Sequence, residues 1–299
     1  MDWIRRHLEV LDYNGTPHAA VGDKVFFRRG KVVSPLGPVK LDYSLTPSQA
    51  RQTLKGLGGW VIHWGYGFVE RPTEWYAVIC DKFQDLAGTP SKHRSEIRRG
   101  LGNCEVRLVD CEYFGRNAYD VYASAARRYR GRTPALRGEE AFRRDLANTA
   151  AFEDIIHHWV ALHKGQVIAY AVACVYGKIQ ATYTQVKLHP DYVKAYPVYA
   201  LMYEMNRHYL AEQGFGYAFD GYRCTGHDTN FQEFLMKKFG FRKAFSRLYM
   251  MYRRDVGLLV KATYPFGRWI GRLGERATQL YVLEGIRRSC ERESPQAGL

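Results

Sequence analysis

Three apolar segments joined by two tight turns constrain the fold of this 299-residue chain more than any other feature. The segments occupy residues 155–163, 167–176 and 180–186, and the turns contain Gly165 and Gly177. β-branched and aromatic residues are frequent in the segments, and glycine readily adopts the positive φ that short hairpin turns require. The pattern predicts an antiparallel meander of three strands.

The elements expected after the meander alternate between helix and strand, because the apolar period changes from two residues to about 3.6 and back. They are a helix over 198–213, a strand over 217–220, a helix from Asp228 or Thr229 to Lys238, and a strand over 245–252. The order predicted from residue 155 onward is therefore β-β-β-α-β-α-β.

The first 90 residues are expected to form short strands and turns around one helix. A hairpin turns at Arg29-Gly30, a helix starts at Thr46-Pro47, and strands cover 60–64 and 75–80. The next elements are a basic helix over 92–101, a strand over 104–109 and a helix over 117–130. The chain is thus expected to be a mixed α/β protein of the α+β class.

Positive charge is concentrated in two windows of the sequence. The formal net charge is +14; residues 92–144 hold thirteen Lys and Arg against seven Asp and Glu, and residues 242–299 hold twelve against five. A localised positive field gains affinity for a polyanion by releasing counterions along one track. The distribution favours a phosphate-bearing partner, and a solubilising basic surface is the alternative.

Cysteine spacing and apolar run length argue against several classes of protein. The six cysteines form no CxxC pair, and no carboxylate stands at ligand spacing from the adjacent His157 and His158, so no metal site is expected. The sequence shows no signal-peptide core and no apolar run near the ~18 residues of a membrane span. We therefore expect a reduced, cytoplasmic protein.

The segment Lys-Phe-Gly-Phe at 238–241 closes an order of elements that resembles the acyltransferase half of the GNAT superfamily. With the helix from Tyr119 included, the match covers roughly 117–254, and residues 1–116 look like a shorter, degraded copy of the same unit. Residues 255–299 follow as a basic, aromatic tail with a helix expected over 277–290.

Tandem GNAT-like halves are similar to the Fem family, and Lys92–Arg99 resembles the basic helix of Fem-type transferases. This resemblance implies that an aminoacyl group is moved from aminoacyl-tRNA, as co-substrate, onto an amine.

Two departures from the resemblance bear on the donor. Coenzyme A-using members place a glycine-rich turn before the central helix, where backbone N–H groups hold the pyrophosphate. Here residues 189–199 contain no glycine, and Pro197 removes one donor. The general-acid tyrosine of many GNAT enzymes, four residues before Gly240, is replaced by Met236, whose thioether cannot transfer a proton. Aminoacyl-tRNA is therefore favoured, with no cofactor expected; acyl-coenzyme A or an acyl carrier protein is the alternative donor.

The candidate catalytic residues, Asp220 and Tyr222, stand at the end of the strand that follows the central helix. In this fold that strand and the one before the helix splay apart, so their ends meet the substrates. Asp220 is expected to orient or deprotonate the amine. An ordinary Asp, with a pKa near ~3.9, is a poor base, so burial would have to raise its pKa. Alternatively, Asp220 only begins the turn at Gly221.

Substrate binding is assigned to tyrosine, amide and basic side chains near the same strand ends, because Arg and Lys hold phosphate or carboxylate groups. These residues are Tyr183, Gln185, Lys194, Tyr196 and Arg223. For Tyr196, packing in the core is the alternative.

RNA binding is assigned to Arg94, Arg98 and Arg99 of the basic helix, together with Lys187. Positions 94 and 98 lie one turn apart on the same helix face, so they can follow an RNA backbone; a solvated face is the alternative. The interleaved basic and aromatic residues of the tail can stack on unpaired bases or lie on an anionic membrane surface.

The sequence thus predicts an aminoacyltransferase that forms an amide bond on a small or peptidic amine acceptor. An N-acyltransferase fed by acyl-coenzyme A or an acyl carrier protein is the alternative within the same fold. A catalytically idle RNA-binding protein on a GNAT scaffold is a third reading; it would tolerate loss of Asp220, Tyr222 and Arg223.

Overall fold

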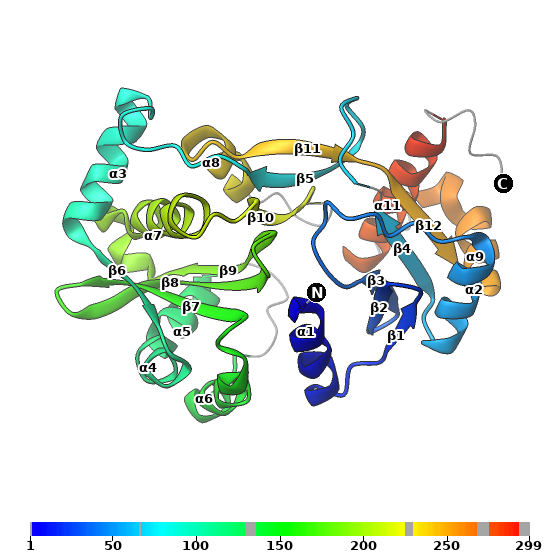
Figure 1. Ribbon diagram of the computed structural model, residues 1–299, viewed down its shortest axis with the longest axis horizontal. Helices are drawn as coiled ribbons and strands as arrows, with labels where there is room; N and C mark the ends of the chain where they lie inside the picture. Colours follow the sequence, from blue (N-terminus) through cyan, green and yellow to red (C-terminus); the bar gives the residue numbers. More distant parts are fainter. Residues whose placement is uncertain (1, 66, 129–135, 225–229, 268–274, 293–299) are drawn as a thin grey trace. The chain divides into compact units, whose positions relative to one another are not determined.

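A computed structural model describes residues 2–65, 67–128, 136–224, 230–267 and 275–292 (Figure 1). The chain divides into two compact units, each assembled from separate stretches of sequence. Unit 1 comprises Met1–Val78, Tyr222–Asn230 and Lys243–Leu299, and unit 2 comprises Ile79–Gly221 and Phe231–Arg242.

Unit 1 is built on a sheet with the strand order β1-β2-β3-β4-β12 within the described residues. Its strands are β1 (His18–Val21), β2 (Lys24–Arg29), β3 (Val32–Pro35), β4 (Val61–Gly65) and β12 (Leu248–Tyr252). Neighbours pair antiparallel except β3 and β4, which are parallel. The expected hairpin at Arg29-Gly30 is confirmed by the β2–β3 pairing.

The helices of unit 1 lie before, within and after this sheet in the sequence. They are α1 (Asp2–Tyr13), α2 (Pro47–Gly56), α9 (Arg254–Thr263), the short 3-10 helix η4 (Tyr264–Phe266) and α11 (Glu275–Arg292). The start of α2 is as predicted, because Thr46 and Gln49 cap it reciprocally and Pro47 opens the first turn. One sheet face, with Phe26, Val33 and Ile62 buried, packs in a core cluster with Ala50 and Leu54 of α2.

The second sheet has the strand order β11-β5-β10-β9-β8-β7-β6. Four strands belong wholly to unit 2: β6 (Glu105–Val109), β7 (Ile156–His163), β8 (Gln166–Tyr176) and β9 (Gln180–Leu188). The boundary between the units falls within the other three: β5 (Trp75–Cys80), β10 (Tyr217–Tyr222) and β11 (Arg242–Ser246). Strands β7, β8 and β9 pair antiparallel in sequence order, which confirms the predicted meander.

Helices cover both faces of the meander (Figure 1). The helical elements of unit 2 are α3 (Ser91–Asn103), α4 (Cys111–Asn117), α5 (Tyr119–Arg128), α6 (Glu139–Ala147), η1 (Ala150–Phe152), η2 (Pro190–Ala195), α7 (Pro197–Asn206), η3 (Arg207–Glu212) and α8 (Asn230–Lys238). Phe114 of α4 and Val121 of α5 pack on one face, against Val160 and Tyr170. The other face meets α7 and η3, where Tyr209 reaches Trp159.

The fold class is confirmed as mixed α/β. The helix expected over 198–213 is α7 followed by the π-helical turn η3. Helices α1, α4, α6 and α9 add to the predicted order. The cap expected at Asp228 or Thr229 lies outside the described residues.

The two compact units do not follow the expected boundaries at residues 116 and 254. Strand β12 pairs with β4, which brings the end of the chain into unit 1. Strand β6 pairs with β7, which brings residues before 116 into unit 2. Both differences come from strand pairing between segments far apart in sequence. None of the described helices is long and apolar enough to cross a bilayer.

Candidate active site

The strands on either side of α7 part from each other after a short parallel ladder. β9 and β10 pair at three positions, from Gln180 opposite Tyr217 to Thr182 opposite Phe219. β9 continues beyond Thr182 on its other neighbour, β8, as far as Leu188. The predicted splay is therefore confirmed: the last paired residue of β10 is Phe219, one residue before Asp220.

Asp220 is a half-buried carboxyl at this splay point. It is the fourth residue of β10, and its side-chain carboxylate has no hydrogen bond or ion pair with any residue that the structure describes. Burial raises its pKa from 3.8 to about 7. A carboxylate that titrates near neutral pH can accept a proton from an attacking amine far better than an ordinary Asp. A pKa raised by burial is what Asp220 was expected to need in order to act as a general base.

Tyr183 lies near Asp220, and its hydroxyl forms a hydrogen bond with another residue of the protein. Its buried hydroxyl donates a hydrogen bond to Asn206 Oδ1 (2.8 Å) at the end of α7. Burial is the main cause that raises the pKa of Tyr183 well above 10, and the charge of Asp220 is a smaller one. Tyr183 therefore supports the floor of the site, and its hydroxyl is not available as a proton donor to substrate.

A second buried network holds η3 against the meander. Trp159 Nε1 donates to the Tyr209 hydroxyl (2.9 Å), and the same hydroxyl lies 2.8 Å from His157 Nδ1. Because an indole can only donate, the Tyr209 proton is assigned to His157 Nδ1, which fixes the tautomer of that ring. Burial lowers the pKa of His157, so the ring stays neutral. π-helical turns such as η3 occur often at functional sites.

Asn206 and Tyr209 were not among the site residues predicted from the sequence. The available signals were the polar Asn206 at the end of an apolar helix face, and the alternation that puts His157 and Trp159 on one face of a strand. No group of three or more His, Cys, Asp or Glu side chains that could hold a metal ion occurs among the described residues.

A β-bulge separates Gln185 and Lys187 from Tyr183. Ala173 pairs with Tyr183 and Val172 with Gln185, which leaves Thr184 as an extra residue in β9. Paired residues share a sheet face, so Gln185 and Lys187 lie on the face of Val172 and Tyr170, toward α4 and α5. The structure therefore does not place Gln185 on the side of Tyr183, and RNA binding by Lys187 stays a prediction. Burial lowers the pKa of Lys187.

Tyr222 and Arg223 belong to unit 1 and have partners there. The Tyr222 ring stacks on Trp75, with centroids 4.8 Å apart. Arg223 forms an ion pair with the Glu74 carboxylate and donates to the Glu74 carbonyl oxygen (3.0 Å). Gly221, between Asp220 and Tyr222, has a φ of +110°, so strand alternation does not continue across it. An anion that binds Arg223, as expected from the sequence, would have to displace the Glu74 carboxylate.

Helix α3 covers the first turn of α7. Tyr196, the residue before Pro197, has a left-handed backbone (φ 59°), and its N–H donates to the Val193 carbonyl. Gly100 of α3 lies so close that a methyl group there would be 2.7 Å from the Tyr196 carbonyl oxygen and 3.0 Å from the Ala200 nitrogen. The turn thus lies under packed helix backbone. Lys194, on η2, is exposed.

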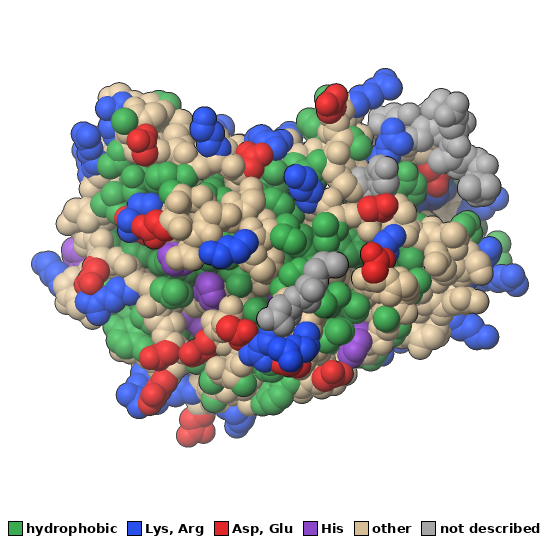
Figure 2. All heavy atoms as spheres, in the orientation of Figure 1, with side chains coloured by type: hydrophobic (Ala, Val, Ile, Leu, Met, Phe, Trp, Pro, Cys, Tyr) green, Lys and Arg blue, Asp and Glu red, His purple; other side chains and the backbone are tan. Residues whose placement is uncertain are grey.

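The three arginines of α3 have different surroundings. Arg94 is half-buried, and its Nε and Nη2 atoms donate to the Thr89 carbonyl oxygen (3.2 and 3.0 Å). Arg98 and Arg99 are exposed, and the Arg99 guanidinium lies 5.9 Å from the centre of the Tyr196 ring. Figure 2 shows Lys and Arg side chains along the outer edge of α3. Arg94 is thus turned back to the start of its helix, whereas Arg98 is exposed, and RNA binding by these arginines stays a prediction.

The meander, the parting β9–β10 pair and the helices on either side of it form a fold that solved structures of other proteins share. The chain resembles two solved structures over most of its length. FemX matches with a TM-score of 0.58 at 10% identity, over 86% of this chain and 92% of that one. The C-terminal DUF2156 domain of a putative lysylphosphatidylglycerol synthetase from Agrobacterium fabrum matches with a TM-score of 0.54 at 13% identity, over 87% and 94%.

No family model and no curated protein matches the chain. The structural likeness therefore confirms the fold that the residues predicted, and at these identities it establishes nothing more specific.

Proposed function

We propose that the protein is an aminoacyltransferase that moves an aminoacyl group from aminoacyl-tRNA to an amine acceptor and forms an amide bond. The observation that carries the proposal is Asp220, a half-buried carboxyl with a pKa of about 7 and no partner among the described residues, at the point where β9 and β10 part. The Fem-type fold supports acyl transfer as the reaction class.

In the proposed step, Asp220 takes one proton from the acceptor so that the amine is neutral when it attacks. The amine nitrogen attacks the ester carbonyl carbon, the C–N bond forms, and the carbonyl oxygen carries the negative charge of the tetrahedral intermediate. The C–O bond to the ribose then breaks as the nitrogen gives up its second proton, and the ribose oxygen takes a proton through its vicinal hydroxyl or water. Beyond Thr182, the edge of β9 toward β10 is outside their ladder, and its N–H groups are the candidates for stabilising the oxyanion.

Two features support a donor other than coenzyme A. The first turn of α7 contains no glycine, has Pro197 in place of one N–H donor, and lies against the backbone of α3 at Gly100. A pyrophosphate needs the opposite arrangement, with N–H groups open to the ligand. Met236 of α8 stands where a general-acid tyrosine would protonate a leaving thiolate. A ribose hydroxyl can receive its proton from its vicinal hydroxyl or from water.

The test is transfer of label from total tRNA charged with a mixture of labelled amino acids to the amines of a cell extract. We expect label to move from an alkali-labile ester into an alkali-stable amide, and RNase treatment of the charged tRNA to abolish the transfer. Transfer from labelled acyl-coenzyme A instead would contradict the donor and support the alternative.

Asp220→Asn is expected to lower the rate of this transfer by about 10²-fold or more while tRNA affinity stays unchanged. The matched control is Asp191→Asn, because Asp191 is an exposed residue of η2. If Asp220→Asn transfers label as fast as the control, the base is assigned to the wrong residue. If neither donor supports transfer but tRNA binds, the chain is the RNA-binding protein of the third reading.

A further inference from the structure

The sheet of unit 1 and the C-terminal tail enclose a cavity of about 700 Å³, here called the tail cavity. One wall is the sheet face that bears His63 and its partner Met250, opposite the face that packs on α2. The other wall comes from Val256 of α9 and from Leu280 and Leu283 of α11. A cavity of this size lies within the range of small-molecule sites.

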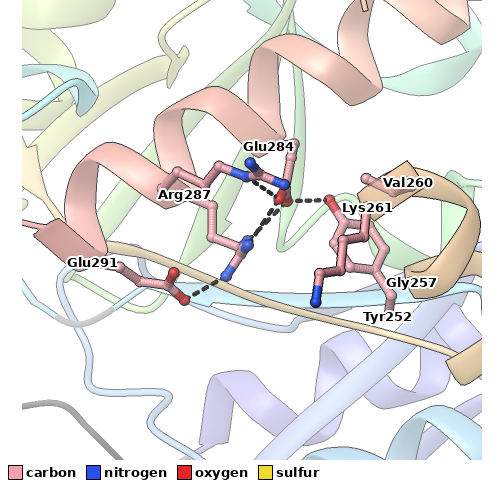
Figure 3. A pocket seen from close by; sticks show the side chains of 8 residues that line it. Tyr252, Gly257, Val260, Lys261, Glu284, Arg287 and Glu291 are labelled. Carbon is pink, nitrogen blue, oxygen red and sulfur yellow. Dashed lines mark hydrogen bonds and ion pairs between the residues drawn. The ribbon is translucent and has the colours of Figure 1, made fainter. Parts of the chain in front are cut away.

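A buried carboxylate fixes α11 against the sheet. Glu284 is 2% exposed and accepts hydrogen bonds from the Tyr252 hydroxyl (2.9 Å), from Arg287 Nη2 (2.8 Å) and from Arg288 Nε (2.7 Å). Figure 3 shows this carboxylate between the Arg287 side chain and Tyr252. Burial acts to raise the pKa of Glu284, but the hydrogen bonds from both arginines outweigh it and lower the pKa. The helix wall of the tail cavity is thus held in place by ionised groups outside it.

The two ends of the tail cavity differ in exposure. Trp75 and Leu248 at one end are 6% and 2% exposed, so this end is closed. Trp60 and Val32 at the other end are 44% and 40% exposed, so this end is the mouth. Large apolar side chains that remain exposed at the mouth of an apolar cavity are typical of a ligand site.

The charged groups of the tail cavity are at its mouth. Arg29 and Lys31 are exposed on the β2–β3 turn, and neither forms an ion pair with a described residue. Lys31 Nζ lies 5.4 Å from the centre of the Trp60 ring, in a cation–π arrangement. A ligand that enters the tail cavity therefore passes these two cations and the Trp60 ring.

The interior carries no charged group among its described residues. His63 Nε2 lies 2.8 Å from the Ser34 hydroxyl, and burial lowers the pKa of His63 to about 4, so the ring is neutral at physiological pH. The Tyr252 hydroxyl is committed to Glu284. An ionised head group inside would be stripped of water without a counter-charge, which is unfavourable.

We propose that the tail cavity is a binding site for an anionic amphiphile with one apolar chain. The chain lies between the sheet and α11, and the anionic head group stays at the mouth with Arg29 and Lys31. The shared chemistry is a carboxylate or phosphate on an alkyl chain, as in a fatty acid or an alkyl phosphate. The site lies wholly within unit 1 and does not depend on the proposed transfer reaction.

The test uses the full chain and three probes below their aggregation concentrations: dodecyl phosphate, 12-bromododecanoate and uncharged dodecanol. Calorimetry should show that both anions bind and that dodecanol binds at least tenfold more weakly. The two anions distinguish a phosphate from a carboxylate head group. Because Trp60 and Trp75 line the cavity, the bromine should quench tryptophan fluorescence, and Trp60→Phe should reduce that quenching without abolishing binding.

The variants separate the head-group contact from the chain contact. The double variant Arg29→Glu with Lys31→Glu should lower the affinity for both anions by at least tenfold. The matched charge reversal Arg51→Glu with Lys55→Glu, at exposed positions of α2, should leave both affinities unchanged. Leu280→Trp should fill the cavity and abolish binding of all three probes. Equal affinity for dodecanol and the anions, or wild-type affinity after reversal at 29 and 31, would overturn the proposal. Absence of quenching in wild type would overturn the location, whether or not Leu280→Trp folds.

Discussion

Ionisation of the buried Asp220 carboxyl lowers the stability of the folded protein. This loss depends on pH and can be measured without knowing the substrate. Its pKa is about 7 in the folded protein and near 3.8 when unfolded. Its contribution to stability is therefore complete below pH 3.8 and is lost progressively as the pH rises to about 7. Asp220→Asn should unfold like wild type at pH 4 and be more stable by about 2–4 kcal/mol at pH 8.

Urea unfolding of both proteins at pH 4, 6 and 8 measures this difference, and Asp191→Asn is the exposed control. A stability difference that does not change with pH would mean that Asp220 has the same, ordinary pKa in the folded and the unfolded protein. The base proposed for the transfer reaction would then lose its physical basis.

At the same scale, sequence reasoning placed Asp220 correctly because its position depends only on the order of elements. It misplaced Gln185 and Lys187 because a single extra residue, Thr184, reverses the faces of the strand that follows it. It could not see that Arg94 binds Thr89 or that Arg223 binds Glu74, since the second pair is 149 positions apart. Apolar periodicity does not reveal which side chains contact each other when they are far apart in the sequence.

Helix α3 packs against α7 at a glycine that leaves no room for a side chain. Alanine substitutions at this glycine and at a second, open glycine of α3 test that packing. A methyl group at Gly100 would lie 2.7 Å from the Tyr196 carbonyl oxygen, whereas one at Gly102 would meet nothing within 4 Å. Gly100→Ala should therefore destabilise unit 2 by about 1–3 kcal/mol through overpacking. Gly102→Ala should stabilise it by about 0.5–1 kcal/mol, because alanine is the better helix former.

Chemical denaturation of the two variants beside wild type gives both values. Opposite signs are the expected result. If Gly100→Ala is as stable as Gly102→Ala, then α3 does not lie on the first turn of α7, and that turn is open to a pyrophosphate. The same pair of variants thus checks the packing on which the choice of donor depends.

Elements with strong periodicity were predictable, and those held by distant contacts were not. The meander and the capped helix α2 follow from local pattern and turn chemistry. α6 was not predicted because it is short and none of its residues is fully buried, so that Phe142 and Leu146, which pack against the core, give only a weak apolar pattern. The strand expected over 245–252 is two strands, β11 and β12, in two different sheets. Which sheet a strand joins is decided by partners elsewhere in the chain.

For the molecule as a whole, formal charge overstates the field that a polyanion meets. Many arginines of the 92–144 window lie beside carboxylates, as in the ion pairs Arg107–Glu105, Arg116–Glu112 and Arg143–Glu139. In the C-terminal window, Arg287 and Arg288 share Glu284. By contrast, Arg98 and Arg99 are exposed on α3 with no ion pair to a described residue. Among the described residues of the first window, Arg98 and Arg99 are therefore adjacent cations that no carboxylate neutralises.

Arg98→Glu with Arg99→Glu should accordingly weaken tRNA binding by about tenfold or more at ~0.1 M salt, because two phosphate contacts become repulsions. The slope of log affinity against log salt should become shallower by about two, since fewer counterions are released. Filter binding over a series of salt concentrations measures both quantities. The control is the reversal of Arg51 and Lys55 on α2, which changes the net charge by the same amount in unit 1. Equal losses in the two double variants would indicate a general dependence on net charge, and no loss in either would remove α3 from the RNA-binding surface.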